Sequence, residues 1–228
     1  MELQTVTPQI TNNTQLEVKI SLEYDSFLSL LHLALQKYPK EIIADLYGER
    51  LNDSHLFRVK FAAYVKTIKP TKFKAATDAK RQETVARNLN SMTPYEYLGD
   101  AHTHPIYRRQ PKMRPKPKEL HSLIERLDER AGLGEGDILD MQKSRKFIYM
   151  VLAVSPKIID FRNWMHINEQ GTLIGSTPVN DGNPEYHYYF RAFSYDPKQK
   201  DFARARIQCQ FPDNLEHFLV KQPTNQSV

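Results

Sequence analysis

The stretch Tyr95-Glu96-Tyr97-Leu98-Gly99-Asp100-Ala101-His102-Thr103-His104-Pro105 is typical of a β-strand that ends at a proline. Its aromatic and apolar residues favour extended backbone, and Pro105 ends the strand because proline has no N–H for the ladder. Side chains alternate along a strand, so His102 and His104 point to the same face. Histidine is the commonest metal ligand, and imidazole suits zinc. The pair therefore predicts part of a metal site at the end of this strand.

Two other segments offer carboxylates to such a site. Residues 41–48 form an apolar stretch that opens with Glu41 and is typical of a buried strand running into a turn. Residues 134–139 place Asp137 at the start of an expected helix. Two histidines and one carboxylate leave one of zinc's four tetrahedral positions for water, which is the ligand set of a catalytic site. A glutamate that does not bind the metal can then accept a proton from that water.

In their order and register, these segments resemble the JAMM zinc metalloproteases, also called the MPN-plus or JAB-type family. The family pattern is Glu-x-x-Gly-x-Leu-x-Gly, then His-x-His-Pro, then Ser-x-x-Asp. The positions that match it are Glu41, Leu46, Gly48, His102, His104, Pro105 and Asp137. Ala44 stands in place of the first glycine, and Gly134 stands where the serine is expected. The resemblance covers most of residues 15–175.

This resemblance implies a fold, a cofactor and a reaction. The implied fold class is α/β, a JAMM/MPN-like (cytidine-deaminase-like) curved mixed sheet flanked by helices. His102, His104 and Asp137 are expected to bind one zinc ion per chain, and Glu41 to act as the general base. The implied activity is hydrolysis of amide or isopeptide bonds in a protein or peptide substrate, including ubiquitin-like or other small-protein tails.

Two departures from the family pattern bear on this expectation. Asp137 follows His104 by 33 positions, a longer spacing than the family has. The alternative third ligands are therefore Asp140, Glu135 and Asp128. Gly134 has no side chain with which to polarise a substrate carbonyl, so either a backbone N–H or another hydroxyl does so, or the site is weak or degenerate. Asp100 precedes His102 by two residues, which predicts that it orients an imidazole on the same face.

A basic stretch follows the second histidine, His104, directly in the sequence. Between Pro105 and Pro117 there is no acidic residue, and the basic residues are Arg108, Arg109, Lys112, Arg114 and Lys116. One interpretation of this stretch is a solvated loop. The other is a surface near the zinc that selects acidic substrates, with Arg108 and Arg109 as the main candidates for contacting them. Residues 119–131 follow with helical spacing of apolar residues. This helix is expected to pack through Leu120, Leu123, Ile124 and Leu127.

The chain of 228 residues predicts a single elaborated domain. We expect a flexible arm at residues 1–14 and a JAMM/MPN-like domain at 15–228. Insertions are expected at about 70–93 and 106–133, with a C-terminal extension from about 176. Beyond the segments above, strands are expected at residues 15–22, 56–68, 147–154, 157–165, 186–195 and 202–210, and helices near residues 26–37, 78–89 and 213–219.

Composition favours a cytoplasmic protein. Cys209 is the single cysteine, which excludes an internal disulfide framework and fits a reducing compartment. The longest apolar run is shorter than the ~20 residues that a membrane span requires, and the amino terminus lacks a signal pattern. The net charge of +5 does not by itself indicate nucleic-acid binding.

The sequence also suggests three alternatives to the hydrolase. The first is a catalytically weak or inactive MPN-fold scaffold that acts through protein contacts. The second is a nucleic-acid-associated protein that uses the basic loop. The third rests on Asp100, His102 and His104, whose Asp-x-His-x-His spacing also resembles the opening of amidohydrolase and PHP-type metal barrels. Those barrels require ~250 residues with this motif on the first strand, and about a hundred residues precede it here, so the length disfavours them.

Overall fold

The computed structural model describes residues 17–51, 55–65, 67–68, 76–77, 79–106, 125–144, 147–156, 165–177, 186–196 and 201–209. Its helices are α1 (Tyr24–Lys37), α2 (Ala79–Met92) and α4 (Glu135–Ser144), and residues 125–130 are also helical. Its strands are β1 (Lys19–Leu22), β2 (Ile43–Arg50), β3 (Leu56–Val65), β4 (Thr67–Ile68), β5 (Ala76–Thr77), β6 (Glu96–Pro105), β7 (Ile148–Pro156), β8 (Met165–Ile167), β9 (Leu173–Ser176), β10 (Tyr186–Asp196) and β11 (Asp201–Cys209). The predicted histidine strand is β6, and it ends at Pro105 as expected.

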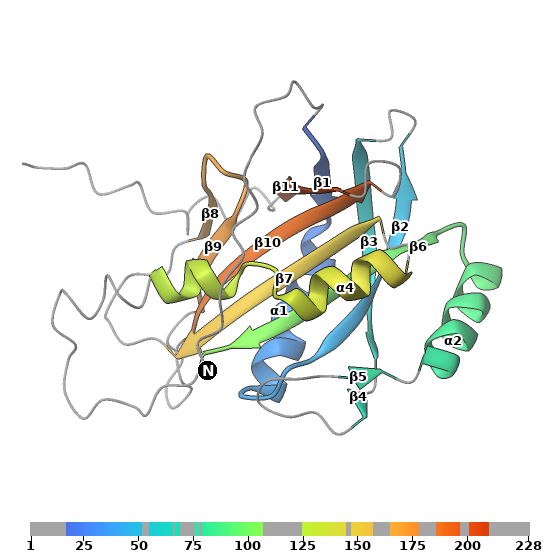
Figure 1. Cartoon of the computed structure of the whole chain (residues 1–228), viewed down its shortest axis with the longest axis horizontal. Coiled ribbons are helices and arrows are strands. Elements are labelled where there is room, and N and C mark those ends of the chain that lie inside the picture. Colours follow the sequence, from blue (N-terminus) through green and yellow to red (C-terminus); the bar gives the residue numbers. More distant parts are fainter. Residues whose placement is uncertain are drawn as a thin grey trace, which may run out of the picture.

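Seven strands close into a barrel. Their order is β11-β1-β3-β2-β6-β7-β10, and β10 pairs back onto β11 (Figure 1). The closing ladder is antiparallel and runs from Ala192 opposite Ala205 to Asp196 opposite Asp201. β9 and β8 continue the sheet from the other part of β10. Closure leaves these seven strands without an open edge, which removes a site for unwanted strand addition.

The predicted fold class is therefore wrong. We expected a curved α/β sheet flanked by helices, of the JAMM/MPN-like type, whereas the strands form a closed barrel with few helices in the described residues. The pairing that overturns the prediction joins β10 to β11, and β11 in turn pairs in parallel with β1. Alternation of side chains indicates which face of a strand is buried, but it does not specify which strand lies alongside. The sequence pattern therefore allowed either an open or a closed sheet.

One apolar cluster fills the inside of the barrel. It draws on every barrel strand and on α1, whose Phe27, Leu30 and Ala34 are buried. Its members from the strands include Ile20, Leu46, Val59, Leu98, Met150, Phe190 and Ile207. Burying such a side chain contributes about 1.5–3 kcal/mol relative to leaving it in water. The barrel is therefore a packed core and a rigid support for side chains on its outer face.

The outer face of β6 and β7 lies beneath α4. Along β7 the alternation sends Tyr149 and Val151 outward, where they pack against Met141 of α4. Figure 1 shows α4 crossing this part of the barrel, with α1 on the opposite side. The carboxyl-terminal half of β6 therefore presents its outward side chains to the start of α4.

A glycine bulge sets the register of β6. The β2–β6 ladder shifts between Leu46 and Tyr47, opposite Gly99. Gly99 has φ 153°, and a Cβ at this position would lie 1.9 Å from the carbonyl oxygen of Ile148. Only glycine fits this close approach. A bulge re-aims the side chains that follow it, so Gly99 helps to fix which face His102 and His104 occupy.

The predicted insertions and termini are described only in part. The arm at residues 1–14 lies outside the described residues, as does the terminal helix expected at 213–219. The segment expected as a C-terminal extension from about 176 contains β10 and β11, which complete the barrel. Among the described helices, none is long and apolar enough to cross a membrane.

Candidate metal centre

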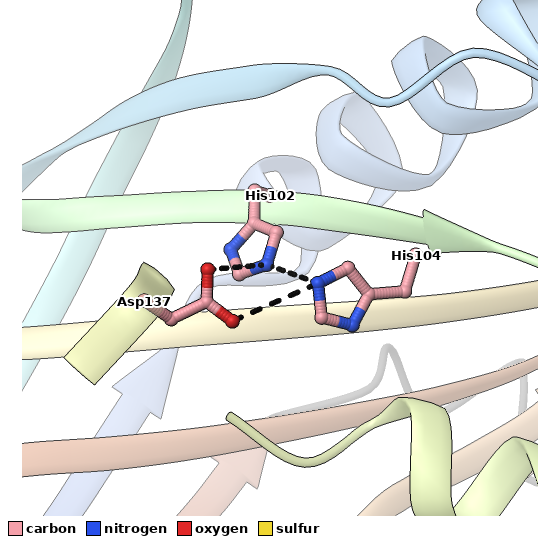
Figure 2. Close-up of side chains that lie close together, drawn as sticks. All are labelled: His102, His104 and Asp137. Atoms are coloured by element: carbon pink, nitrogen blue, oxygen red, sulfur yellow. Dashed lines mark hydrogen bonds and ion pairs between the residues drawn. The ribbon is translucent and has the colours of Figure 1, made fainter. Parts of the chain in front are cut away.

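The side chains of His102, His104 and Asp137 converge on one point (Figure 2). The two histidines project from the outer face of β6, and Asp137 lies in the first turn of α4. One potential ligand atom from each residue lies within 4.8 Å of the other two. His102 Nε2 lies 3.5 Å from Asp137 Oδ1, and His104 Nε2 lies 3.8 Å from Asp137 Oδ2. The structure thus brings together the three residues predicted as zinc ligands.

A backbone carbonyl fixes the orientation of His104. Its Nδ1 lies 2.5 Å from the carbonyl oxygen of Arg130, at the end of the helical residues 125–130. A carbonyl can only accept, so Nδ1 carries the hydrogen and donates it, and Nε2 keeps its lone pair. Burial, together with the neighbouring His102, lowers the pKa of His104 to about 3. The ring is therefore neutral at neutral pH, as metal binding requires.

His102 is held mainly by packing. Its side chain is 6% exposed, and its ring centroid lies 4.9 Å from that of Tyr149 on β7. Its Nδ1 is buried and has no hydrogen-bond partner in the described part of the chain. Its Nε2 lies 2.6 Å from Nε2 of His104. Both rings therefore direct the same type of nitrogen into the cluster.

Asp137 is positioned from two sides. Its Oδ2 accepts a hydrogen bond of 2.8 Å from the N–H of Gly134, the residue before α4 begins. Its Oδ1 accepts one of 3.3 Å from the hydroxyl of Tyr149. Burial would raise the pKa of Asp137, but its interaction with His102, with smaller effects of His104 and the N–H of Gly134, lowers it below its usual range. The carboxylate is therefore ionised and anchored to the helix start, in the manner of a capping box.

The alternative third ligands do not enter this cluster. Asp140 lies one turn further along α4 and is exposed, as is Glu135. Asp128 instead forms an ion pair with Arg191 of β10. Among the described residues, the group that could hold a metal contains Asp137 and none of these three.

The three side chains are of types that bind zinc, and most of the distances between their ligand atoms are close to those of a tetrahedral zinc site. Two ligands at ~2.0 Å from a tetrahedral ion lie ~3.3 Å apart. The nitrogen–oxygen distances of 3.5 and 3.8 Å are close to that separation. The nitrogen–nitrogen distance of 2.6 Å is shorter, so the two rings would separate by about 0.7 Å around an ion. Two neutral imidazoles and a carboxylate are ligands that zinc accepts, with a position left open.

The register of the β2–β6 ladder, continued beyond Ile43, puts Glu41 on the same face of the barrel as the histidines. In the antiparallel β2–β6 ladder Ile43 is opposite His102, and the N–H of Thr103 donates to the carbonyl of Ile42 at 3.1 Å. Continuing this register by two residues places Glu41 opposite His104, and directly opposed residues on antiparallel strands share a face, with Cβ atoms ~5 Å apart. Glu41 is 7% exposed and is not part of the potential metal cluster in the described residues.

Asp100 belongs to a buried acidic pair beside the site. It lies opposite Asp45 across β6 and β2, and both are almost fully buried. Asp100 accepts a hydrogen bond of 2.5 Å from the hydroxyl of Tyr97. Nδ1 of His102 has no partner in the described residues and Nδ1 of His104 bonds to Arg130, so the orienting role of Asp100 stays a prediction. Arg108 and Arg109 lie outside the described residues.

Sequence reasoning missed two groups that hold the site. Tyr149 contacts both His102 and Asp137, and the carbonyl of Arg130 holds His104. The sequence signal that could have identified Tyr149 is that it carries the one hydroxyl group in the apolar run from Phe147 to Val154. Its pKa is raised, first by burial and then by Asp137, so its phenol remains a donor. A backbone carbonyl leaves no comparable signal in the sequence.

Replacing Tyr149 with phenylalanine should weaken zinc binding about tenfold, because the outer partners of metal ligands typically contribute that much or more. The change removes the hydrogen bond to Asp137 but keeps the ring against His102. Affinity is measured by competition with a chromophoric chelator. Tyr195→Phe is the matched control, since Tyr195 packs on Phe202 in the same apolar cluster. Equal affinity in both variants would remove Tyr149 from the support of the site.

Comparisons with known proteins do not assign a role to this centre. No protein-family model matches the chain, and no curated protein matches it. Among solved structures, the solution structure of protein DSY2949 from Desulfitobacterium hafniense is similar, at 15% sequence identity and a TM-score of 0.45. The alignment covers 89% of this chain and 99% of that chain. A TM-score at that level carries no inference about fold or function.

Proposed function

We propose that this protein is a zinc-dependent hydrolase that cleaves amide or isopeptide bonds with a JAMM-type set of catalytic residues. The observation that supports this proposal most strongly is the convergence of His102, His104 and Asp137 on one point, with Glu41 on the same face. Two histidines and one carboxylate form a site with an open position, which distinguishes catalytic from closed structural zinc sites. The proposal concerns this set of residues and does not depend on the fold of the JAMM family.

His104 and Asp137 have separate tasks in the proposed site. His104 presents Nε2 because Arg130 holds its Nδ1–H, and Asp137 supplies negative charge from the start of α4. Zinc, when bound, supplies a lowered pKa for a coordinated water, towards ~7, and polarisation of the substrate carbonyl. The packed barrel wall beneath β6 keeps the histidines in place as the substrate binds.

Glu41 moves the proton in this proposal. Its carboxylate accepts a proton from the attacking water as the new C–O bond forms. It then delivers that proton to the leaving amine nitrogen as the C–N bond breaks. The register of β2 against β6 supports this role, because its continuation to Glu41 is opposite His104 and Glu41 is outside the potential metal cluster of the described residues. General acid–base catalysis of this kind contributes about 100- to 10,000-fold to the rate.

The substrate that we propose is a protein or peptide, including the tails of ubiquitin-like or other small proteins. We place the enzyme in the cytoplasm, where a protein with one cysteine keeps a free thiol. Burial raises the pKa of the Cys209 thiol to about 12, so this cysteine is not a competing nucleophile. Nucleic-acid binding by the basic loop is a lesser alternative.

One observation favours the alternative of a weak or inactive site. Gly134 stands where a serine is expected, and its N–H donates to Asp137. That N–H is therefore not available to polarise a substrate carbonyl. A serine side chain would fit, because a Cβ at Gly134 would lie 3.4 Å from Asp137 Oδ2, an ordinary contact. A metal-binding scaffold that acts through protein contacts is the second candidate function.

The two candidates differ in turnover by the zinc-loaded protein. Protein carrying one equivalent of zinc is incubated with fluorogenic peptides and with lysine-linked isopeptides of ubiquitin-like tails. The hydrolase proposal predicts cleavage that a chelator abolishes and added zinc restores. Zinc bound at one equivalent, with no cleavage of any substrate in the set, would support the scaffold instead.

A further inference from the structure

We propose that Arg191 and Arg204 form a binding site for an oxyanion, a carboxylate or a phosphate, on the same face of the barrel as the metal centre. The two guanidinium groups come from the neighbouring strands β10 and β11. Both donate to one acceptor, the hydroxyl oxygen of Thr172, which is fully buried. This site shares no residue with the proposed zinc site.

The charges of the pair are not balanced. Arg191 has one carboxylate partner, Asp128, and also donates to the carbonyl of Asp128 at 2.7 Å. Arg204 donates to Thr172, and its Nε is buried without a hydrogen-bond partner among the described residues. Among the described residues, two guanidinium charges therefore face one carboxylate. Burial, followed by the charge of Arg191, lowers the pKa of Arg204 to about 10, which reflects the same excess of positive charge.

The hydrogen-bond donors around Arg204 also indicate that an acceptor binds here. The hydroxyl oxygen of Thr172 has two lone pairs, and the two arginines occupy both, so the hydroxyl can only donate. Nε of Arg204 is buried and has no acceptor among the described residues. Buried donors in native proteins nearly always have a partner. An oxyanion satisfies this donor and neutralises the charge, and the planar fork of arginine suits carboxylate and phosphate.

The neighbouring arginine on β11 lacks these features. Arg206 donates at 2.9 Å to the carboxylate of Glu17 and at 2.7 Å to the carbonyl of Glu169. Its charge is therefore matched by a carboxylate in the structure. Arg206 is on the same strand and two residues away, which makes it a close control for removal of one positive charge.

The strand pairings place the oxyanion site near the metal centre. Val151 of β7 lies opposite His102 of β6 on one side and opposite Arg191 of β10 on the other. Two strand spacings separate His102 from Arg191, a distance of about 10 Å between backbones. If the proposed hydrolase is correct, the oxyanion is an acidic group of its substrate about this far from the scissile bond. That link alone rests on the proposed function.

Asp128 is the group with which an incoming anion would compete. Its side chain is 55% exposed, whereas that of Arg191 is 12% exposed, so Asp128 lies on the solvent side of the ion pair. Removing its charge should strengthen oxyanion binding, whereas removing that of Arg204 should weaken it. Opposite effects from two neighbouring residues separate this site from general attraction to a basic protein.

The test is a titration of metal-free, isotope-labelled protein at an ionic strength of about 0.15 M, where the screening length is about 8 Å, followed through the Nε–H signals of its arginines. Inorganic phosphate and acetate are added separately, which distinguishes a preference for phosphate from one for carboxylate. We expect the Arg204 signal to shift with a dissociation constant of about 1 mM for the preferred anion. Arg204→Gln should weaken binding at least tenfold, because hydrogen bonds to charged groups contribute about 1.5–3 kcal/mol. Asp128→Asn should strengthen binding, and Arg206→Gln should leave it within about twofold.

Arg204→Lys keeps the charge in case Arg204→Gln does not fold, and it should bind more weakly than wild type because lysine lacks the fork. Thermal unfolding of each variant reports whether it is folded. The proposal is overturned if neither anion shifts the Arg204 signal of the wild-type protein. It is equally overturned if Arg204→Gln, or Arg204→Lys in its place, binds no more weakly than Arg206→Gln. Because no zinc is present, these outcomes are independent of the hydrolase proposal.

Discussion

Glu41→Gln should lower the turnover of the zinc-loaded protein by about 100- to 10,000-fold, the range that general acid–base catalysis contributes. Glutamine has nearly the same shape as glutamate but cannot accept the proton from the attacking water. Zinc should remain bound at one equivalent, because the three ligands converge without Glu41. The measurement pairs the initial rate on a cleaved isopeptide with metal analysis of the same sample.

Glu49→Gln is the matched control for this change. Glu49 lies on the same strand, β2, but is partly exposed and pairs with Arg58 at 3.3 Å on the surface. An exposed pair of this kind contributes little, so rate and zinc content should remain those of the wild type. Loss of zinc from Glu41→Gln would mean that Glu41 is a ligand or holds one in place. Full activity in Glu41→Gln would assign the proton transfer to another group.

His104→Ala should weaken zinc binding by about 100-fold or more. Structural sites with four ligands bind zinc with ~10–16 kcal/mol in total, so each ligand contributes about 3 kcal/mol. Asp137→Asn should have a similar effect because it removes the negative charge of the site. Asp137 also accepts the N–H of Gly134 at the start of α4, and asparagine keeps an oxygen for that bond. Both affinities are measured by competition with a chelator of known affinity.

Two control substitutions test whether these effects are specific. His32→Ala removes an exposed histidine of α1, and Asp140→Asn removes an exposed carboxylate one turn after Asp137. Both should bind zinc as the wild type does. If Asp140→Asn loses zinc and Asp137→Asn keeps it, the third ligand is Asp140 and the helix presents a different face to the histidines.

The part of the site that sequence could predict depends on local geometry. Alternation along one strand predicted that His102 and His104 share a face, and they do. The start of a helix at residues 134–139 predicted the place of Asp137, which is in the first turn of α4. Contacts between segments that are distant in the sequence could not be predicted from local geometry. The packing of Tyr149 on His102 depends on the parallel pairing of β6 with β7, which no local pattern specifies.

The fold was harder to predict than the site for the same reason. The strands at β6, β7, β10 and β11 were expected from their composition and alternation, and the structure has them. Whether the sheet stays open depends on one long-range choice, the pairing of β11 with both β10 and β1. The bulge at Gly99 was also not predicted, although a glycine inside a strand is typical of one. The JAMM resemblance came from short motifs, which bear on the site more than on the closure of a sheet.

The most direct test of the central claim is the zinc content of the wild-type protein. Purified protein is stripped with a chelator, reloaded with excess zinc, separated from unbound metal and measured by elemental analysis against its concentration. We predict about one zinc per chain, because one open His-His-Asp site holds one ion. A reloaded, folded protein that retains no zinc would contradict the metal centre and, with it, the proposed hydrolase.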